Sequence, residues 1–315
     1  MNLIIITENS DLYSSKQFYH IGKKMGFSSL FANPYQSNLF VSNNKSNNTS
    51  LNETIVLHRT TGIRHDDFDL ELSLDLEQKG ALVLNSPVKL KILRDKLAQQ
   101  IFFSNKNIPI IPSYAFRGRP NDNLIDDIDE CFDSANNKPS KYILKTTRGN
   151  GGIGVNLLES KKSLKSVLDT FWGIKDQKFI IQPFLERATE YRFFFIADKL
   201  VSVVQKQTKE SDFRANSTKA DHLYVTDYKP LPKNILDIAY RIHSLSGLFY
   251  SGVDLIEHQS KIYFMELNAV PGFETLDKLS GKNIAKEILI SAEKYYKTLN
   301  SNIEDEDETT SSILK

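Results

Sequence analysis

Residues 252–273, GVDLIEHQSKIYFMELNAVPGF, decide the fold that we expect for this chain. Two apolar runs flank a polar segment in this stretch, and that pattern predicts two short strands joined by a tight turn. A turn at residues 259–261 would pair His258 with Ile262 in an antiparallel hairpin. This register also predicts which polar side chains on the two strands face each other.

Three oxygen-bearing side chains come together in that register. Asp254 would lie opposite Glu266, where facing Cβ atoms are roughly 5 Å apart. Glu266 and Asn268 are two residues apart, so the alternation of a strand puts both on one face. Clustered carboxylates repel each other unless a cation such as Mg²⁺ binds them. The Pro271-Gly272 turn, which ends the strand there, favours a site over the alternative of an ordinary surface hairpin. We therefore predict Asp254, Glu266 and Asn268 as ligands of Mg²⁺, with Mn²⁺ as an alternative ion.

Length and composition indicate a globular protein with more than one subdomain. The chain has 315 residues, of which 40% are hydrophobic and 25% charged. Its formal net charge of +1 gives no reason to expect nucleic acid or an anionic membrane as a partner. No apolar run approaches the ~20 residues of a membrane span, and the single Cys131 excludes an internal disulfide. We expect a cytoplasmic protein that acts on soluble partners.

The order of strand and helix signals divides the chain into four segments. Residues 1–86 alternate strands and helices, which predicts a small parallel sheet with helical cover. Residues 87–180 open with a helix whose apolar stripe runs from Leu90 to Ile101, and they include a glycine-rich loop. Residues 181–299 hold the predicted metal site, and the acidic residues 300–315 are expected to be disordered.

The glycine cluster Gly149-Asn150-Gly151-Gly152-Ile153-Gly154 lies between two predicted strands. It matches the dinucleotide pattern G-x-G-x-x-G, but that pattern must open a helix, and Val155–Leu158 predicts a strand. It is not a P-loop either, because Val155 and Asn156 replace the Lys and Ser/Thr. A loop of this kind can fold over phosphates and donate backbone N–H groups. Lys145 ends the strand before the loop, within reach of a phosphate.

Two further groups of residues are candidates for binding adenine and for stabilising a transferring phosphoryl group. Pro183 cannot donate a ladder hydrogen bond, so the strand ending at Gln182 would leave the backbone of Phe184 and Leu185 free for adenine. Arg192 and Arg214 could stabilise charge on a transferring phosphoryl group, an effect typically worth about 10²–10³ in rate. A buried strand end and surface salt bridges are the competing interpretations.

These motifs occur in the order and spacing of ATP-grasp proteins, and the chain resembles most closely the RimK-type carboxylate–amine ligases, which add glutamate to protein or peptide carboxyl groups. The resemblance covers roughly residues 86–297. It rests on DK at 95–96, ILK at 143–145, the glycine loop at 149–154, QPFLE at 182–186, EYR at 190–192, DFRAN at 212–216, GVD at 252–254 and MELNAVPGF at 265–273. Two departures, at 205–207 and 217–221, lie near the acceptor side.

The resemblance implies an α/β (α+β) ATP-grasp fold with ATP held between two α+β subdomains, preceded by a small βα domain. It implies Mg²⁺ on the three predicted ligands and Arg192 and Arg214 as catalytic residues. It also implies a nucleotide site made of Lys96, Lys145, Gly149, Gly151, Gly152, Gly154, Gln182, Phe184, Leu185 and Glu190. The expected partners are ATP and amino-acid, peptide or protein substrates, and a homo-oligomer is an open alternative.

The function that follows is an ATP-dependent ligase, which forms an acyl phosphate that an amine then attacks. Such chemistry needs positioning and charge stabilisation but no protein nucleophile. Replacing Asp254 by Asn should then abolish turnover and leave the fold intact. A nucleotide-binding regulatory or scaffold protein without turnover and an ATP-grasp kinase are the alternatives.

Overall fold

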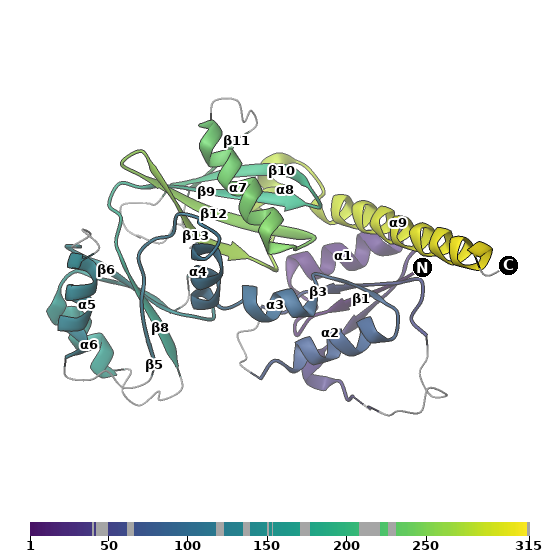
Figure 1. The fold of residues 1–315 in the computed structure, drawn as a ribbon, viewed down its shortest axis with the longest axis horizontal. Helices are drawn as coiled ribbons and strands as arrows, with labels where there is room; N and C mark the ends of the chain where they lie inside the picture. Colours follow the sequence, from purple (N-terminus) through teal and green to yellow (C-terminus); the bar gives the residue numbers. More distant parts are fainter. Residues whose placement is uncertain are drawn as a thin grey trace.

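Three β-sheets, each with its own helices, organise the chain (Figure 1). The structure is a computed structural model. It describes residues 1–39, 41, 50–61, 66–117, 123–134, 139–149, 151–152, 154–170, 177–207, 221–225 and 231–313. One sheet of four strands is parallel, and the other sheets, of four and five strands, are antiparallel. This mixture confirms the predicted α/β (α+β) class.

The N-terminal sheet is parallel and has the strand order β2-β1-β3-β4. Its strands are β1 (Asn2–Ile6), β2 (Ser28–Ala32), β3 (Thr54–His58) and β4 (Leu82–Leu84), and its helices are α1 (Tyr13–Lys24), the 3₁₀ helix η1 (Pro34–Gln36) and α2 (Phe68–Gln78). The predicted βα alternation is therefore present. Strand β2 was not predicted, because its polar start, Ser28-Ser29, hides the alternation.

The loop sheet carries the glycine-rich loop and has the antiparallel order β5-β8-β6-β7. Its elements are β5 (Tyr114–Arg117), α5 (Leu124–Ser134), β6 (Tyr142–Thr146), β7 (Val155–Leu158), α6 (Lys161–Thr170) and β8 (Lys178–Pro183). Buried Leu144 and Ile181 on the sheet pack with Ile128 of α5 and Leu164 of α6. The boundary predicted between residues 180 and 181 would cut through β8, so it belongs after Pro183.

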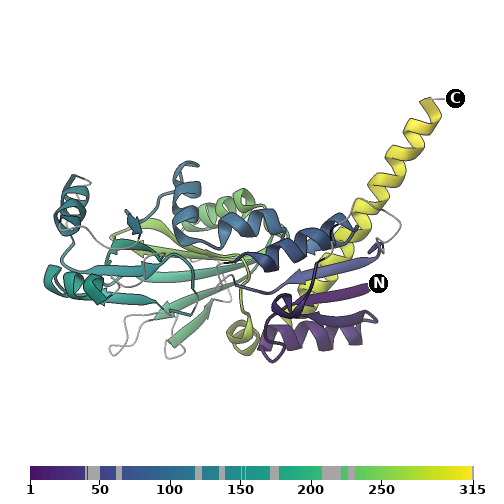
Figure 2. The same ribbon diagram turned by 90° about the horizontal axis from the view of Figure 1, so that it is seen from below.

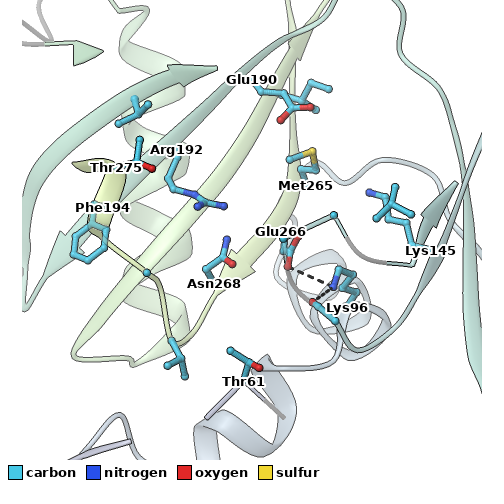
Figure 3. A pocket seen from close by; sticks show the side chains of 18 of the residues that line it. Thr61, Lys96, Lys145, Glu190, Arg192, Phe194, Met265, Glu266, Asn268 and Thr275 are labelled. Carbon is cyan, nitrogen blue, oxygen red and sulfur yellow. Dashed lines mark hydrogen bonds and ion pairs between the residues drawn. The ribbon is translucent and has the colours of Figure 1, made fainter. Parts of the chain in front are cut away.

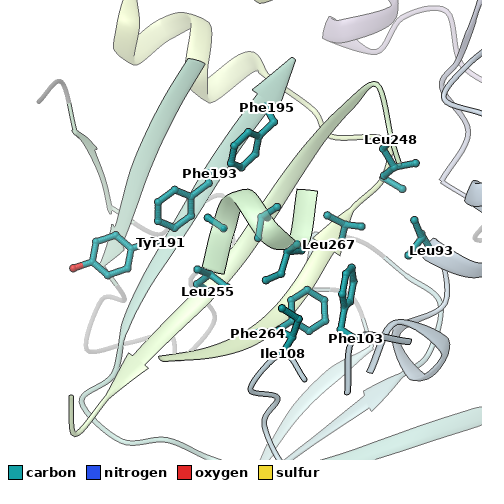
Figure 4. Packing of buried hydrophobic residues seen from close by; sticks show 14 of the residues in the cluster. Leu93, Phe103, Ile108, Tyr191, Phe193, Phe195, Leu248, Leu255, Phe264 and Leu267 are labelled. Atoms are coloured by element: carbon teal, nitrogen blue, oxygen red, sulfur yellow. The ribbon is translucent and has the colours of Figure 1, made fainter. Parts of the chain in front are cut away.

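The large sheet lies between two hydrophobic cores and has the order β11-β10-β9-β12-β13. Its elements are β9 (Thr189–Ile196), β10 (Lys199–Gln207), β11 (Asp221–Val225), α7 (Lys233–Ser246), β12 (Tyr250–His258), β13 (Lys261–Asn268) and α8 (Glu274–Ser280). Phe193 and Phe195 of β9 pack in the cluster with α7 (Figure 4). Phe194 and Ile196 point to the other face, in a cluster shared with the N-terminal sheet.

Two short helices replace the single helix predicted for the stripe from Leu90 to Ile101. They are α3 (Pro87–Leu93) and α4 (Lys96–Ser104). Asp95 separates them, because its side chain accepts hydrogen bonds from the N–H groups of Leu97 and Ala98 at 3.0 and 3.1 Å and so caps α4. The break makes Lys96 the first residue of α4, where its side chain is only 12% exposed.

The last helix, α9 (Ile284–Ile313), extends through most of the acidic segment. The sequence predicted disorder over residues 300–315, whereas the structure continues this helix to Ile313. Ile284, Ile288 and Ala292 are fully buried and anchor the first half, and Glu, a good helix former, allows the helix to continue. Figure 2 shows its C-terminal end projecting away from the sheets. No helix in the described ranges is long and apolar enough to cross a membrane.

Candidate active site

A cavity of about 560 Å³ lies where the three sheets meet, within the range usual for small-molecule sites. Figure 3 shows Lys145 on one side and Phe194 on the other, with Glu266 and Asn268 between them. The structure brings most of the predicted site residues to its wall: Lys96, Lys145, Gly149, Gly151, Gly152, Gln182, Phe184, Leu185, Glu190, Arg192, Glu266 and Asn268. Gly154 and Asp254 do not line the cavity, and Arg214 lies outside the described residues.

The β12–β13 hairpin has the predicted pairing of Asp254 with Glu266. The register next to the turn differs from the predicted one, because His258 pairs with Lys261 and the turn consists of Gln259 and Ser260 alone. Both turn residues have positive φ, 49° and 61°, as a tight two-residue hairpin turn requires. A β-bulge at Met265 then adds one residue and restores the register. The bulge also lets consecutive residues, Met265 and Glu266, line the cavity.

Asp254 is fully buried and holds two neighbours in place. It accepts hydrogen bonds from Nε and Nη2 of Arg192, on the adjacent strand β9, at 2.7 and 2.6 Å. It also accepts one from Nδ2 of Asn268 at 3.0 Å. Burial by itself would lower the pKa of Arg192, but the Asp254 carboxylate raises it well above its ordinary value. Asp254 therefore supplies the counter-charge of Arg192 and turns the oxygen of Asn268 away from itself.

Glu266 and Asn268 present oxygen atoms that suit a hard divalent cation. Glu266 Oε1 lies 3.5 Å from the ammonium of Lys96, and both side chains are partly exposed to the cavity. The amide nitrogen of Asn268 is used by Asp254, which leaves its oxygen available. These two residues fit a metal ion directly. The carboxylate of Asp254 already accepts hydrogen bonds from Arg192 and Asn268, so in this arrangement Asp254 orients the ligands and does not bind the ion itself.

Lys145 supplies a second ammonium to the cavity. It donates a hydrogen bond to Oε1 of Gln182 at 2.9 Å, and Gln182 in turn donates to Oγ of Ser113 at 2.8 Å. Burial lowers the pKa of Lys145, although nearby Glu266 acts to raise it. Because its hydrogen-bond partner is neutral, this lysine favours an incoming anion.

The glycine-rich loop is fastened at its base to the N-terminal part of the chain. Lys96 Nζ donates to the carbonyl of Gly149 at 2.8 Å, and Thr147 Oγ1 donates to Asp95 at 3.0 Å. Arg148 Nη1 donates to Asp67, just before α2, at 2.9 Å. Gly154 has a structural part in this base, since a Cβ there would lie 2.6 Å from Oγ1 of Thr146 and φ is +76°. Sequence reasoning missed Asp67 and Arg148, because their pairing joins distant segments.

Asp67 should influence binding of the ATP that the sequence leads us to expect, although it does not line the cavity. Asp67 also accepts a hydrogen bond from Arg94, which Asp69 holds as well. Asp67→Asn therefore removes the charge that pairs with Arg148. We expect KM for ATP to rise by roughly 10-fold with little change in kcat, because a charge-assisted hydrogen bond contributes ~1.5 kcal/mol. Steady-state kinetics of ADP release measures this. Asp66→Asn, an exposed neighbour, is the matched control, and an unchanged KM in both variants would contradict the anchoring role.

The three-sheet fold, with a cavity lined by lysines and glycines between two α+β units, defines the chain as an ATP-grasp protein. Residues 94–292 match the model of the RimK-like ATP-grasp domain. The chain belongs to the RimK-like ATP-grasp family. It is accordingly an ATP-dependent carboxylate–amine ligase.

Comparisons over the full length agree with that assignment. The chain is 27% identical over 301 residues to a probable alpha-L-glutamate ligase of Alkalilimnicola ehrlichii, covering 93% of this chain and 96% of the relative. A RimK domain ATP-grasp protein from Sphaerobacter thermophilus superposes with a TM-score of 0.68 at 16% identity, covering 91% and 98% of the two chains. The ATP-grasp ligase PsnB, in a complex with a precursor variant, Mg and ADP, superposes with a TM-score of 0.67 at 16% identity, covering 91% and 96%.

Proposed function

We propose that this ligase adds glutamate, or a similar amino acid, to a carboxyl group of a peptide or protein. The observation that carries this proposal is one cavity with two ends. Lysines and glycines line the first end, and the second is formed by the N-terminal sheet with its helices, which we call the N-terminal module. The first end suits a nucleotide and the second suits an amino acid or chain terminus. The names of the relatives, probable alpha-L-glutamate ligases, support glutamate as the amine.

The nucleotide would bind between the loop sheet and the large sheet. The N–H of Phe184 donates to the carbonyl of Lys141 at 3.0 Å, so the prediction that its backbone is free for adenine is wrong for that N–H group. Adenine would lie against Phe184 and Leu185, directly after β8, and Glu190 would hold the ribose. Lys96 and Lys145 would contact the phosphates, and the N–H groups of the glycine-rich loop would cover them. The support for this placement is that these residues line one side of the same cavity.

Glu266 and Asn268 would hold Mg²⁺, with Mn²⁺ as a possible replacement, and Asp254 would orient them. The metal supplies positive charge that neutralises the phosphates during transfer. Arg192, which is paired with Asp254, lies on the same wall and would stabilise charge on the transferring group. For Arg214, which lies outside the described residues, the same role stays a prediction.

The reaction then needs only positioning by this chain. A carboxylate oxygen attacks the γ-phosphorus of ATP, giving an acyl phosphate and ADP. The amine attacks the acyl carbon, the C–N bond forms, the C–O bond to phosphate breaks, and the ammonium proton passes to solvent or phosphate. No side chain becomes covalently modified, so the site requires no serine or cysteine nucleophile.

The test combines ADP release with trapping of the intermediate. The unaltered protein is incubated with ATP, Mg²⁺, hydroxylamine and a pool of amino acids and short peptides that end in glutamate. Hydroxamate formed in step with ADP supports an acyl phosphate, and replacing hydroxylamine by glutamate should then give an amide. A stable phosphorylated product without hydroxamate would indicate a kinase. ATP binding without ADP release under any of these conditions would count against ligase turnover.

A further inference from the structure

The end of the cavity formed by the N-terminal module contains a buried cation, Arg59. This residue follows β3 directly, at the carboxyl edge of the parallel sheet, where open α/β sheets bind ligands. Its side chain lines the cavity although the residue is only 7% exposed. Thr61, two residues later, is labelled in Figure 3 and marks this wall.

The partners of the Arg59 guanidinium are neutral. Nη1 donates to the hydroxyl of Tyr250 at 3.2 Å, and Nη2 donates to the carbonyl of Pro271 at 3.0 Å. The buried Nε has no hydrogen-bond partner in the part of the chain that the structure describes. A guanidinium has five N–H donors, and burying its charge without a counter-charge is costly. Arg59 therefore has both unused donors and an electrostatic need for an anion.

The first turn of α1 forms the same wall and is also positive. Tyr13, Ser14 and Ser15 line the cavity. The first N–H groups of a helix have no partners within it. No side-chain hydrogen bond caps this end at Leu12, and no acidic residue lies in the first turn. Free N–H groups and the helix dipole both favour an anion there.

Among the described residues at this end of the cavity, the other charged side chain does not neutralise Arg59. Glu274, at the start of α8, also lines the cavity, but its carboxylate is paired with Lys278 at 2.6 Å. The hydroxyl of Tyr250 and the carbonyl of Pro271 hold the guanidinium in place. Arg59 is thus a fixed cation on the cavity wall, close to the turn that follows Asn268.

We propose that Arg59 and the first turn of α1 bind a carboxylate of the amino-acid substrate that takes no part in bond formation. This inference rests on the proposed function. The carboxylate that reacts must meet the γ-phosphate, which we place beside Glu266 and Asn268. The amine substrate glutamate has two carboxylates that stay unchanged when its nitrogen attacks the acyl phosphate. Binding one of them at Arg59 would select an amino acid over a simple amine.

Calorimetry tests the site without requiring turnover. Glutamate is titrated into the full chain in the presence of Mg²⁺ and a non-hydrolysable ATP analogue. We expect Arg59→Met to raise the Kd for glutamate by about 10- to 100-fold, as expected for a lost charge-assisted contact, and to leave the Kd for the ATP analogue unchanged. Arg59→Lys keeps the charge, so its Kd for glutamate should lie between the values of the unaltered protein and of Arg59→Met. Its melting temperature should equal that of the unaltered protein.

The amides of glutamate show which carboxylate is bound. The unaltered protein should bind glutamine or isoglutamine, whichever lacks the recognised carboxylate, more weakly than glutamate. Arg59→Met should lose that preference. Equal binding of all three ligands by the unaltered protein, or no binding of glutamate at all, would overturn the proposal.

Hydroxylamine separates this proposal from the proposed function, because it is an amine without a carboxylate. Arg59→Met should form hydroxamate at the rate of the unaltered protein. A loss of hydroxamate as large as the loss with glutamate would show that Arg59 serves the fold or the carboxyl substrate, and would overturn the inference. Failure of the unaltered protein to form hydroxamate would count against the ligase function alone. The calorimetric comparison would still measure glutamate binding at Arg59, because it needs no turnover.

Discussion

Glu266→Gln should reduce the rate of ADP formation by at least about 10²–10³-fold, the usual loss when a group that stabilises transition-state charge is removed. Glutamine has the same shape as glutamate but is a neutral and weaker ligand for a divalent cation. The change also removes the charged partner of Lys96, which lies 3.5 Å away, and leaves its hydrogen bond to the carbonyl of Gly149. We expect higher Mg²⁺ concentrations to recover part of the activity, because the remaining oxygen of the side chain can still bind the ion.

The measurement is ADP release as a function of Mg²⁺ concentration, with unfolding curves for each variant. Glu257→Gln is the matched control, since it makes the same chemical change on β12 at a position that does not line the cavity. The Glu266–Lys96 distance is 3.5 Å and Lys96 keeps its hydrogen bond to the carbonyl of Gly149, so Glu266→Gln should cost only about 1 kcal/mol of stability. Full activity in Glu266→Gln at low Mg²⁺ would contradict a role for Glu266 as a metal ligand.

Local patterns were enough to predict much of this site. The pairing of Asp254 with Glu266 depends on alternation within one hairpin, and the prediction was correct although the turn was wrong. The turn was missed because Gln259 and Ser260 carry no glycine or asparagine signal for positive φ. The bulge at Met265 was also missed. The two errors cancelled, since each moved the register by one residue.

Contacts between distant segments could not be predicted in the same way. Arg59 lies in a stretch with no motif, and its place at the cavity depends on how the N-terminal sheet packs against the turn at Pro271. The pair between Asp67 and Arg148 joins the N-terminal part of the chain to the glycine-rich loop. Of these three residues, only Arg59 could have been predicted from the sequence as a site residue. It directly follows a predicted parallel strand, and polar residues at that position lie at the sheet edge where ligands bind.

The position of Asp254 changes what the sequence led us to expect of Asp254→Asn. A solvated metal ligand could be replaced without harm to the fold, whereas Asp254 is fully buried and its carboxylate is the partner of Arg192. The variant would leave the guanidinium, only 27% exposed, beside a neutral amide. Breaking a buried pair on one side typically costs ~3–5 kcal/mol. We therefore expect the free energy of unfolding to fall by about 3 kcal/mol, together with the loss of turnover.

A double-mutant cycle separates this structural role from metal binding. Removing both charges, in Asp254→Asn with Arg192→Gln, should recover much of the lost stability, because no guanidinium is then left beside the neutral amide. Turnover should stay low, since Arg192 is absent and the oxygen of Asn268 is no longer oriented. Chemical denaturation followed by circular dichroism measures the stability of the four proteins. If Asp254→Asn unfolds at the same denaturant concentration as the unaltered protein, Asp254 does not depend on Arg192 for its place, and its role as a direct ligand becomes the better explanation of any lost activity.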